Sequence, residues 1–256
     1  MSPAALRELA ERVAREAGAQ LLEAFGGPAV AVEAKSTPTD LVSAADTAAE
    51  ELIHTGIAAE RPDDGFLGEE GADEHGSSGL RWVVDPLDGT ANFLFGVPQW
   101  AVSVAVEDAD GAVAGVVYDP PRGELWAAER GGEATLDGVP VRGSERAELA
   151  TALVATGFGY DADVRRAQAA TVAALLPDVR DVRRFGAAAL DLAWCAAGRF
   201  DAYYERGVKH WDVAAGGLLC ECAGLVVEPL AEAPPQAAGL LVAPPGLIDA
   251  LRARVA

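Results

Sequence analysis

Trp82 to Phe93, W-V-V-D-P-L-D-G-T-A-N-F, is the stretch around which the chain is organised. Its first three residues are aromatic and β-branched, which is typical of a buried strand. Pro86 has no N–H group for a sheet hydrogen bond and Gly89 has a free backbone, so we predict that the strand ends here in a turn. Two carboxylates, Asp85 and Asp88, then lie together at the carboxyl end of the strand.

The simplest interpretation of Asp-Pro followed by Asp-Gly is an exposed surface turn. Two carboxylates so close together repel each other unless positive charge lies between them, so a functional site requires further ligands. Glu69 follows a short strand and a glycine, and Asp212 opens a helix after the strand around Tyr203. All four acids therefore lie at strand ends or helix starts, where loops expose side chains to a shared cleft.

Composition indicates a globular and strongly acidic protein. Hydrophobic residues make up 50% and charged residues 23% of the 256 residues, as in ordinary soluble domains. The 40 acidic residues outnumber the 20 basic ones, which gives a formal charge of −20. A surface of this sign repels nucleic acid and anionic membrane, so we expect neither as a partner. An anionic small substrate is also repelled unless bound cations reverse the local sign.

Cysteine use and the N-terminal sequence indicate the compartment. The three cysteines are an odd number, so we expect no disulfide framework and a reducing environment. Cys220 and Cys222 lie two residues apart in a predicted helix, so their side chains point to different faces. We therefore expect them to be small core residues and not metal ligands. The chain shows no apolar leader and no run of about 18 apolar residues. We therefore expect a cytoplasmic protein.

Periodicity divides the chain into a helical pair, an antiparallel sheet and an alternating α/β part. Leu6, Leu9 and Val13 recur at helical spacing behind Ser2-Pro3, a good helix start. We predict one domain over 1–256 with layered helices and sheets, an α+β part to about 150 and a smaller α/β part over about 151–256. Later helices are predicted over 43–60, 164–176, 187–197, 213–223 and 247–255, and the main strands over 82–84, 100–107, 113–118, 124–129, 153–155, 179–184, 200–204 and 240–242.

Carboxylates gathered in this way are typical ligands of a hard cation. Magnesium prefers carboxylate oxygens, keeps several waters and takes further ligands from substrate phosphate. Thiolates and imidazoles are not arranged in this sequence for zinc. The chemistry that the acids predict is metal-assisted hydrolysis of a phosphate ester.

At these residues the chain resembles the inositol monophosphatase family of magnesium-dependent, lithium-sensitive phosphatases. Five fixed residues in a six-residue window arise by chance on the order of once in ten thousand in a chain of this size. The resemblance extends over nearly the whole chain and implies a layered α-β-α-β-α sandwich, the sugar-phosphatase fold. It rests on Asp85-Pro86-Leu87-Asp88-Gly89-Thr90 with Asn92-Phe93, on Gly68-Glu69-Glu70, and on Trp211-Asp212-Val213-Ala214-Ala215-Gly216.

The resemblance implies a two-metal centre built from five residues. Glu69, Asp85 and the carbonyl oxygen of Leu87 would hold the first magnesium ion. Asp85, Asp88 and Asp212 would hold the second, so Asp85 bridges a pair of ions that typically lie about 3.5–4 Å apart.

The resemblance also assigns the remaining catalytic residues. Glu69 and the Thr90 hydroxyl would orient and deprotonate the attacking water, and backbone N–H groups at Gly89 and Thr90 would hold phosphate oxygens. Asp46 would join a weaker third metal site, and Lys35 would balance phosphate or order its loop.

The alcohol side of the substrate is matched by later segments. Gly186 and Ala188 lie in the family segment that lines the polyol, although Ala187 stands where Thr or Ser is usual. Glu205 matches a position that accepts hydrogen bonds from inositol hydroxyls, and Asp88 and Asp212 would also contact substrate. The favoured substrate is myo-inositol 1-phosphate, hydrolysed by a homodimer.

Other functions stay open at this point. Glu205 would equally pair with the ammonium group of histidinol phosphate, an amino-alcohol substrate of close relatives. The next candidate substrates, after histidinol phosphate, are fructose 1,6-bisphosphate and 3′-phosphoadenosine 5′-phosphate. A catalytically silent interaction protein on the same fold would be expected to have lost a metal ligand.

Overall fold

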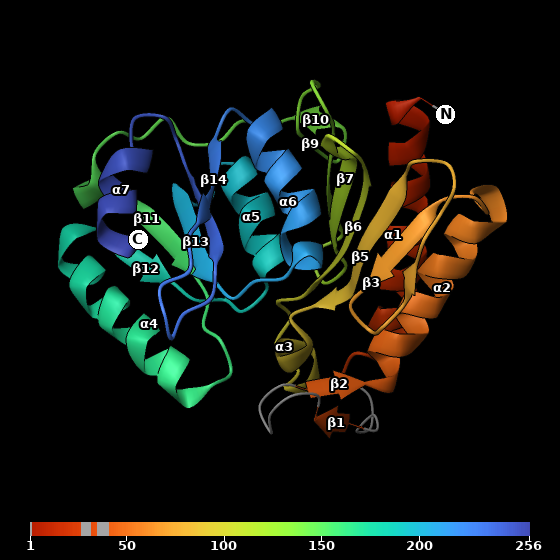
Figure 1. Cartoon of the computed structure of the whole chain (residues 1–256), viewed down its shortest axis with the longest axis horizontal. Coiled ribbons are helices and arrows are strands. Elements are labelled where there is room, and N and C mark those ends of the chain that lie inside the picture. The colour runs from red at the N-terminus through yellow and green to blue at the C-terminus, as the bar shows by residue number, and fades with distance from the viewer. Residues whose placement is uncertain (1, 27–31, 35–40) are drawn as a thin grey trace.

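Five layers of helices and sheets follow one another across the molecule (Figure 1). The structure is a computed structural model that describes residues 2–26, 32–34 and 41–256, with the backbone alone for 32–34 and 41–43. Helices α1 and α2 form one outer layer, and α4 and α7 form the other. Helices α5 and α6 lie in the middle layer between two sheets. The layered α-β-α-β-α sandwich predicted from the sequence is confirmed.

The outer pair α1 (Pro3–Ala24) and α2 (Ala44–Glu60) covers one face of the larger sheet. α1 begins at Ser2, whose hydroxyl accepts a hydrogen bond from the backbone N–H of Ala5, followed by proline in the first turn. Its apolar stripe is buried against the sheet, as the helical spacing predicts. Among the described residues, no helix combines the length and the apolar character needed to cross a bilayer.

The larger sheet has eight strands in the order β10-β9-β8-β7-β6-β5-β3-β4. Neighbouring strands are antiparallel except for the parallel pair β3 and β5. The Asp137-Gly138 turn joins β9 to β10. The strands are β3 (Gly65–Gly68), β4 (Asp73–Glu74), β5 (Arg81–Asp88), β6 (Ala101–Asp108), β7 (Gly111–Asp119), β8 (Glu124–Glu129), β9 (Thr135–Leu136) and β10 (Val139–Pro140).

The strand in the opening stretch does not end at Asp85, so that prediction is wrong. β5 continues to Asp88, because its register against β6 shifts between the Asp85–Ser103 pair and the Asp88–Ala101 pair. A bulge of this kind leaves its extra residues unpaired, so the missing N–H of Pro86 costs no ladder hydrogen bond. The bulge also keeps both carboxylates on the sheet, which is a more rigid support than a turn.

The middle layer consists of α5 (Ala188–Ala196) and α6 (His210–Cys222). Their apolar faces pack on the second face of the larger sheet and on the smaller sheet. α6 approaches β7 very closely, since a Cβ atom on Gly115 would lie 2.9 Å from the Cα atom of Ala215. α6 begins at His210, three residues earlier than predicted, so Asp212 lies inside its first turn.

The smaller sheet has the order β12-β11-β13-β15-β14, with parallel pairing of β11 to β12 and β13. Its strands are β11 (Leu153–Thr156), β12 (Asp181–Arg183), β13 (Ala202–Arg206), β14 (Val226–Leu230) and β15 (Gly239–Ala243). Helices α4 (Ala162–Leu175) and α7 (Ile248–Val255) complete this part, with short 3-10 helices at Leu149–Thr151 and Leu176–Asp178. Near the site lie α3 (Thr90–Leu94) and the pair β1 (Val32–Ala34) and β2 (Leu41–Ser43).

Candidate active site

A pocket of about 460 Å³ lies where the bulge of β5 meets the first turns of α5 and α6. It also includes the loop from Phe158 to Asp161, which precedes α4. Most residues that the sequence assigned to catalysis, metal binding or substrate binding line this one pocket: Glu69, Asp85, Leu87, Asp88, Gly89, Thr90, Gly186, Ala188, Glu205 and Asp212. Lys35 lies outside the described residues.

Three carboxylates converge at one end of the pocket. Glu69 follows β3, Asp85 lies in the bulge of β5, and Asp212 lies in the first turn of α6. Each offers an oxygen atom, and these oxygen atoms lie within 4.8 Å of one another. The tertiary structure therefore gathers acids that are more than 140 residues apart in the sequence into a group that can hold a metal ion.

The electrostatics of Asp85 show that this group needs positive charge. Burial raises the pKa of Asp85 well above its usual range, and the nearby Glu69, Asp88 and Asp212 carboxylates raise it further. Asp85 Oδ1 accepts a single backbone hydrogen bond, from the N–H of Leu87 at 3.0 Å. Carboxylates this close stay ionised only with a cation between them, and oxygen donors suit magnesium. The residues present fit the expected metal.

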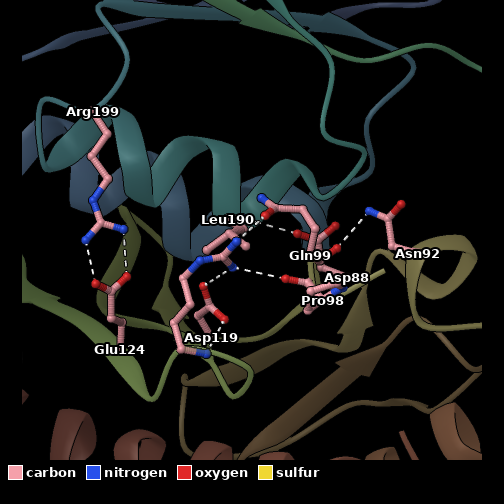
Figure 2. Close-up of polar contacts among 9 residues, drawn as sticks. Asp88, Asn92, Pro98, Gln99, Asp119, Glu124, Leu190 and Arg199 are labelled. Atoms are coloured by element: carbon pink, nitrogen blue, oxygen red, sulfur yellow. Dashed lines mark hydrogen bonds and ion pairs between the residues drawn. The ribbon is translucent and has the colours of Figure 1, made fainter. Parts of the chain in front are cut away.

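Asp88 has a structural task that the sequence did not reveal. One of its carboxylate oxygens accepts a hydrogen bond from the backbone N–H of Ala188 at 2.9 Å. The other accepts one from the backbone N–H of Leu190 at 3.2 Å (Figure 2). Asp88, the last residue of β5, thus caps the start of α5. Burial raises the pKa of Asp88 to about 7 despite these hydrogen bonds. Each oxygen keeps a further lone pair that can face a cation.

Thr90 connects the bulge to α2. Its hydroxyl lies 2.8 Å from Asp46 Oδ1 and 3.1 Å from the carbonyl oxygen of Leu87, and it can donate to either. Asp46 is buried in the first turn of α2. Because both neighbours are acceptors, the hydroxyl hydrogen points toward them and the oxygen lone pairs of Thr90 are left for a donor such as water.

Gly89 and Asn92 shape the backbone beside Thr90. Gly89 has a φ of +92°, and a Cβ atom there would lie 2.9 Å from the carbonyl oxygen of Gln99. The Asn92 side chain donates a hydrogen bond of 2.7 Å to the carbonyl oxygen of Gln99 (Figure 2). It donates another of 2.7 Å to the carbonyl oxygen of Phe185. Asn92 therefore ties α3 to the segment that contains Gly186.

Glu205 lies in β13 and lines the same pocket, outside the group formed by Glu69, Asp85 and Asp212. Tyr203 donates a hydrogen bond of 2.8 Å from its hydroxyl to Glu205 Oε2. Burial raises the pKa of Glu205, whereas the Tyr203 hydrogen bond and the charge of Arg184 lower it. The pocket therefore combines a group of three acids that suits cations with a further carboxylate acceptor outside that group.

Sequence reasoning missed two residues that organise the site. Glu50, in the middle of α2, accepts hydrogen bonds from the backbone N–H groups of Glu70 at 2.8 Å and Ala72 at 3.3 Å, which fixes the loop after Glu69. Its position in a helix gave no signal, since mid-helix glutamates are usually exposed. Arg184, which lies two residues before Gly186, also lines the pocket, and no motif in the sequence indicated a role for it.

The chain is similar in sequence and in structure to proteins of one family. The sequence profile of the inositol monophosphatase family matches residues 3–255. The inositol-1-monophosphatase of Mycobacterium leprae is 47% identical, over 98% of this chain and 93% of that protein. A relative named Nus factor SuhB, from Xylella fastidiosa, is 42% identical over 83% of this chain and 78% of that protein. The crystal structure of extragenic suppressor protein suhB from Bartonella henselae superposes with a TM-score of 0.91, at 35% identity and 98% coverage of both chains.

Proposed function

Because this chain belongs to the inositol monophosphatase family, we propose that it hydrolyses a small polyol phosphate, with myo-inositol 1-phosphate as the substrate, in the presence of magnesium. The observation that carries the proposal is the convergence of Glu69, Asp85 and Asp212 in a pocket that Glu205 also lines. The three acids suit a phosphate accompanied by cations, and Glu205 suits hydroxyl groups.

The metal ligands follow from the position of each acid. Glu69, Asp85 and the Leu87 carbonyl would hold one magnesium ion, and Asp85, Asp88 and Asp212 would hold a second. Asp46, which contacts Thr90, would contribute to a weaker third site. Bound there, magnesium supplies Lewis acidity, which activates water and neutralises charge on the phosphate ester.

Protein groups orient the attacking water. The Thr90 hydroxyl directs its hydrogen toward Asp46, so its oxygen accepts a hydrogen bond from a water in the pocket. Glu69 lies in the same pocket and accepts the proton that this water loses. The backbone at Gly89 and Thr90 lines the place where the phosphate oxygens would lie.

The test is phosphate release with magnesium from four esters: myo-inositol 1-phosphate, histidinol phosphate, fructose 1,6-bisphosphate and 3′-phosphoadenosine 5′-phosphate. We expect the highest kcat/KM for inositol 1-phosphate and no turnover after chelation. A higher kcat/KM for histidinol phosphate would overturn the substrate and leave the metal-assisted mechanism in place. Full activity in a chelator would overturn the mechanism.

A further inference from the structure

Arg184 and Glu205 line the same pocket, and the positive charge of Arg184 lowers the pKa of Glu205. Its central carbon lies 5.7 Å from the centre of the Phe158 ring. A Cβ atom on Gly186 would lie 2.1 Å from Arg184 Nη1, so the guanidinium rests directly on the Gly186 backbone. Within the described part of the chain, Arg184 donates no hydrogen bond to protein, which leaves its N–H groups for a ligand in the pocket.

Glu205 is held next to this cation by rigid contacts. Tyr203 is fully buried and donates its hydroxyl hydrogen to Glu205 Oε2. A Cβ atom on Gly157 would lie 2.0 Å from the same oxygen, so the loop backbone packs directly on the carboxylate. Gly157 contacts Glu205 and Phe158 contacts Arg184, so the two opposite charges lie against adjacent residues of one loop, and the charge of Arg184 lowers the pKa of Glu205.

The other charged residues around the pocket are engaged elsewhere or exposed. Asp161 accepts hydrogen bonds from two backbone N–H groups at the start of α4. The Arg206 guanidinium donates to the carbonyl oxygens of Ala231, Ala237 and Val255. Lys209 is exposed at the rim. Outside the acidic group, the pocket therefore presents Glu205 as a hydrogen-bond acceptor and Arg184 as a donor of opposite charge.

This pairing distinguishes between the candidate substrates by elementary electrostatics. A substrate ammonium group gains from Glu205 and is repelled by Arg184. A second phosphate gains from Arg184 and is repelled by Glu205. Neighbouring hydroxyl groups of a neutral polyol satisfy both side chains, because one hydroxyl donates to Glu205 while the next accepts from Arg184.

We propose that Arg184 is a specificity-determining residue that, paired with Glu205, selects neutral polyol phosphates with adjacent hydroxyl groups over amino-alcohol phosphates and bisphosphates. The inference rests on the proposed function, since it assumes that the acidic end of the pocket receives the phosphate. It assigns the choice of substrate to a side chain that takes no part in the bond-breaking step.

The test compares Arg184→Ala and Arg184→Gln with the wild type and with a matched control, Arg183→Ala. Arg183 is the adjacent arginine, and its guanidinium pairs with Asp181 at 2.5 Å and lies outside the pocket lining. The substrates are myo-inositol 1-phosphate, histidinol phosphate, fructose 1,6-bisphosphate and p-nitrophenyl phosphate, which has no polyol. Circular dichroism checks that each variant is folded.

Loss of the charged hydrogen bond in Arg184→Ala should raise KM for inositol 1-phosphate roughly ten- to hundredfold. We expect kcat/KM for histidinol phosphate to rise in both Arg184 variants, and p-nitrophenyl phosphate hydrolysis to change less than about twofold. Arg184→Gln, which keeps a donor without the charge, should retain part of the inositol 1-phosphate affinity. Arg183→Ala should match the wild type.

Two failures can be told apart. If the wild type hydrolyses inositol 1-phosphate and the Arg184 variants lose all four substrates equally, or lose none, the role of Arg184 is wrong and the proposed function stands. If the wild type prefers histidinol phosphate or fructose 1,6-bisphosphate, the proposed substrate and the selectivity of the charge pair are both wrong.

Discussion

Asp88 combines a proposed metal-binding role with an observed helix cap. It lies at the metal end of the pocket, and both of its carboxylate oxygens accept backbone hydrogen bonds from the first turn of α5. A substitution that removes a metal ligand here also removes a helix cap. Loss of activity at this position is therefore informative only when stability is measured with it.

With magnesium bound to offset the burial of the wild-type carboxylate, Asp88→Asn should abolish turnover and also lower the free energy of unfolding by about 1–3 kcal/mol, because an amide has only one acceptor oxygen for the two N–H groups of Ala188 and Leu190. Phosphate release and urea denaturation measure the two effects. Asp110→Asn, at an exposed hairpin turn, is the control and should change neither. Normal stability in Asp88→Asn would contradict the capping role.

At Thr90, unlike at Asp88, a substitution can change the catalytic rate with little effect on the stability of the fold. Thr90→Val keeps the side-chain shape and removes the hydroxyl that contacts Asp46, so kcat should fall on the order of a hundredfold or more. Thr90→Ser keeps the hydroxyl and should retain most activity. Steady-state kinetics at saturating magnesium make the comparison, and equal losses in the two variants would argue against an orienting hydroxyl.

At the scale of secondary-structure elements, the bulge in β5 and the loop between α2 and β3 hold the site in place. Asp64, in that loop, accepts hydrogen bonds of 2.8 and 2.7 Å from Arg61 and one of 2.9 Å from the indole N–H of Trp82. These contacts connect the end of α2 to the start of β5. The strand that holds Asp85 is therefore anchored at its other end by an ion pair.

The Asp64 contacts make stability depend on pH in the acid range. Burial alone would raise the pKa of Asp64, but hydrogen bonds from Arg61, Ser78 and Trp82 together lower it below its usual 3.8. A lowered pKa stabilises the fold above the unfolded-state value, and this stabilisation is lost as the pH falls through the folded-state value. Asp64→Asn should cost about 1.5–3 kcal/mol at pH 7 and progressively less below about pH 4.

Urea denaturation of Asp64→Asn and the wild type between pH 7 and pH 3 measures this difference. Asp63→Asn, at the exposed neighbouring position, should show a small and nearly constant difference. A difference for Asp64→Asn that stays constant with pH would show that the ion pair does not stabilise the fold.

At the scale of the whole molecule, the acidic group lies where two layers of the fold, which also pack through their apolar faces, meet. Glu69 and Asp85 come from neighbouring strands of the larger sheet, and Asp212 comes from the middle helical layer. Their mutual repulsion opposes the docking of α6, and a cation among them removes that repulsion. Metal binding should therefore stabilise the entire fold.

Magnesium at about 100 times its dissociation constant should add about 2.7 kcal/mol to stability. For a chain of this size, that corresponds to a rise in Tm on the order of 5–10 °C. Thermal unfolding in magnesium and in EDTA measures the shift, and Asp85→Asn should abolish most of it. An equal shift in Asp85→Asn would place the stabilising ion elsewhere.

Local patterns in the sequence were sufficient for much of the architecture. The helical stripe behind Ser2-Pro3, the alternating strands from Trp100 to Glu129 and the Asp137-Gly138 hairpin are all present as predicted. These features depend on residues close together in the chain, so composition and spacing reveal them. The strand through Asp85-Pro86 was missed because a bulge depends on the partner strand β6.

From the sequence by itself, one short motif with Asp85, Asp88 and Thr90 predicted a phosphate ester and a hard cation, and the family match supports the phosphatase part of that prediction. Only the tertiary structure decided which groups meet them. The capping of α5 by Asp88 and the support of the Glu69 loop by Glu50 are contacts between residues 100 and 20 positions apart, and the charge of Arg184 acts on Glu205 from 21 positions away. Such contacts are set by how sheets and helices pack, and packing leaves no local pattern in the sequence.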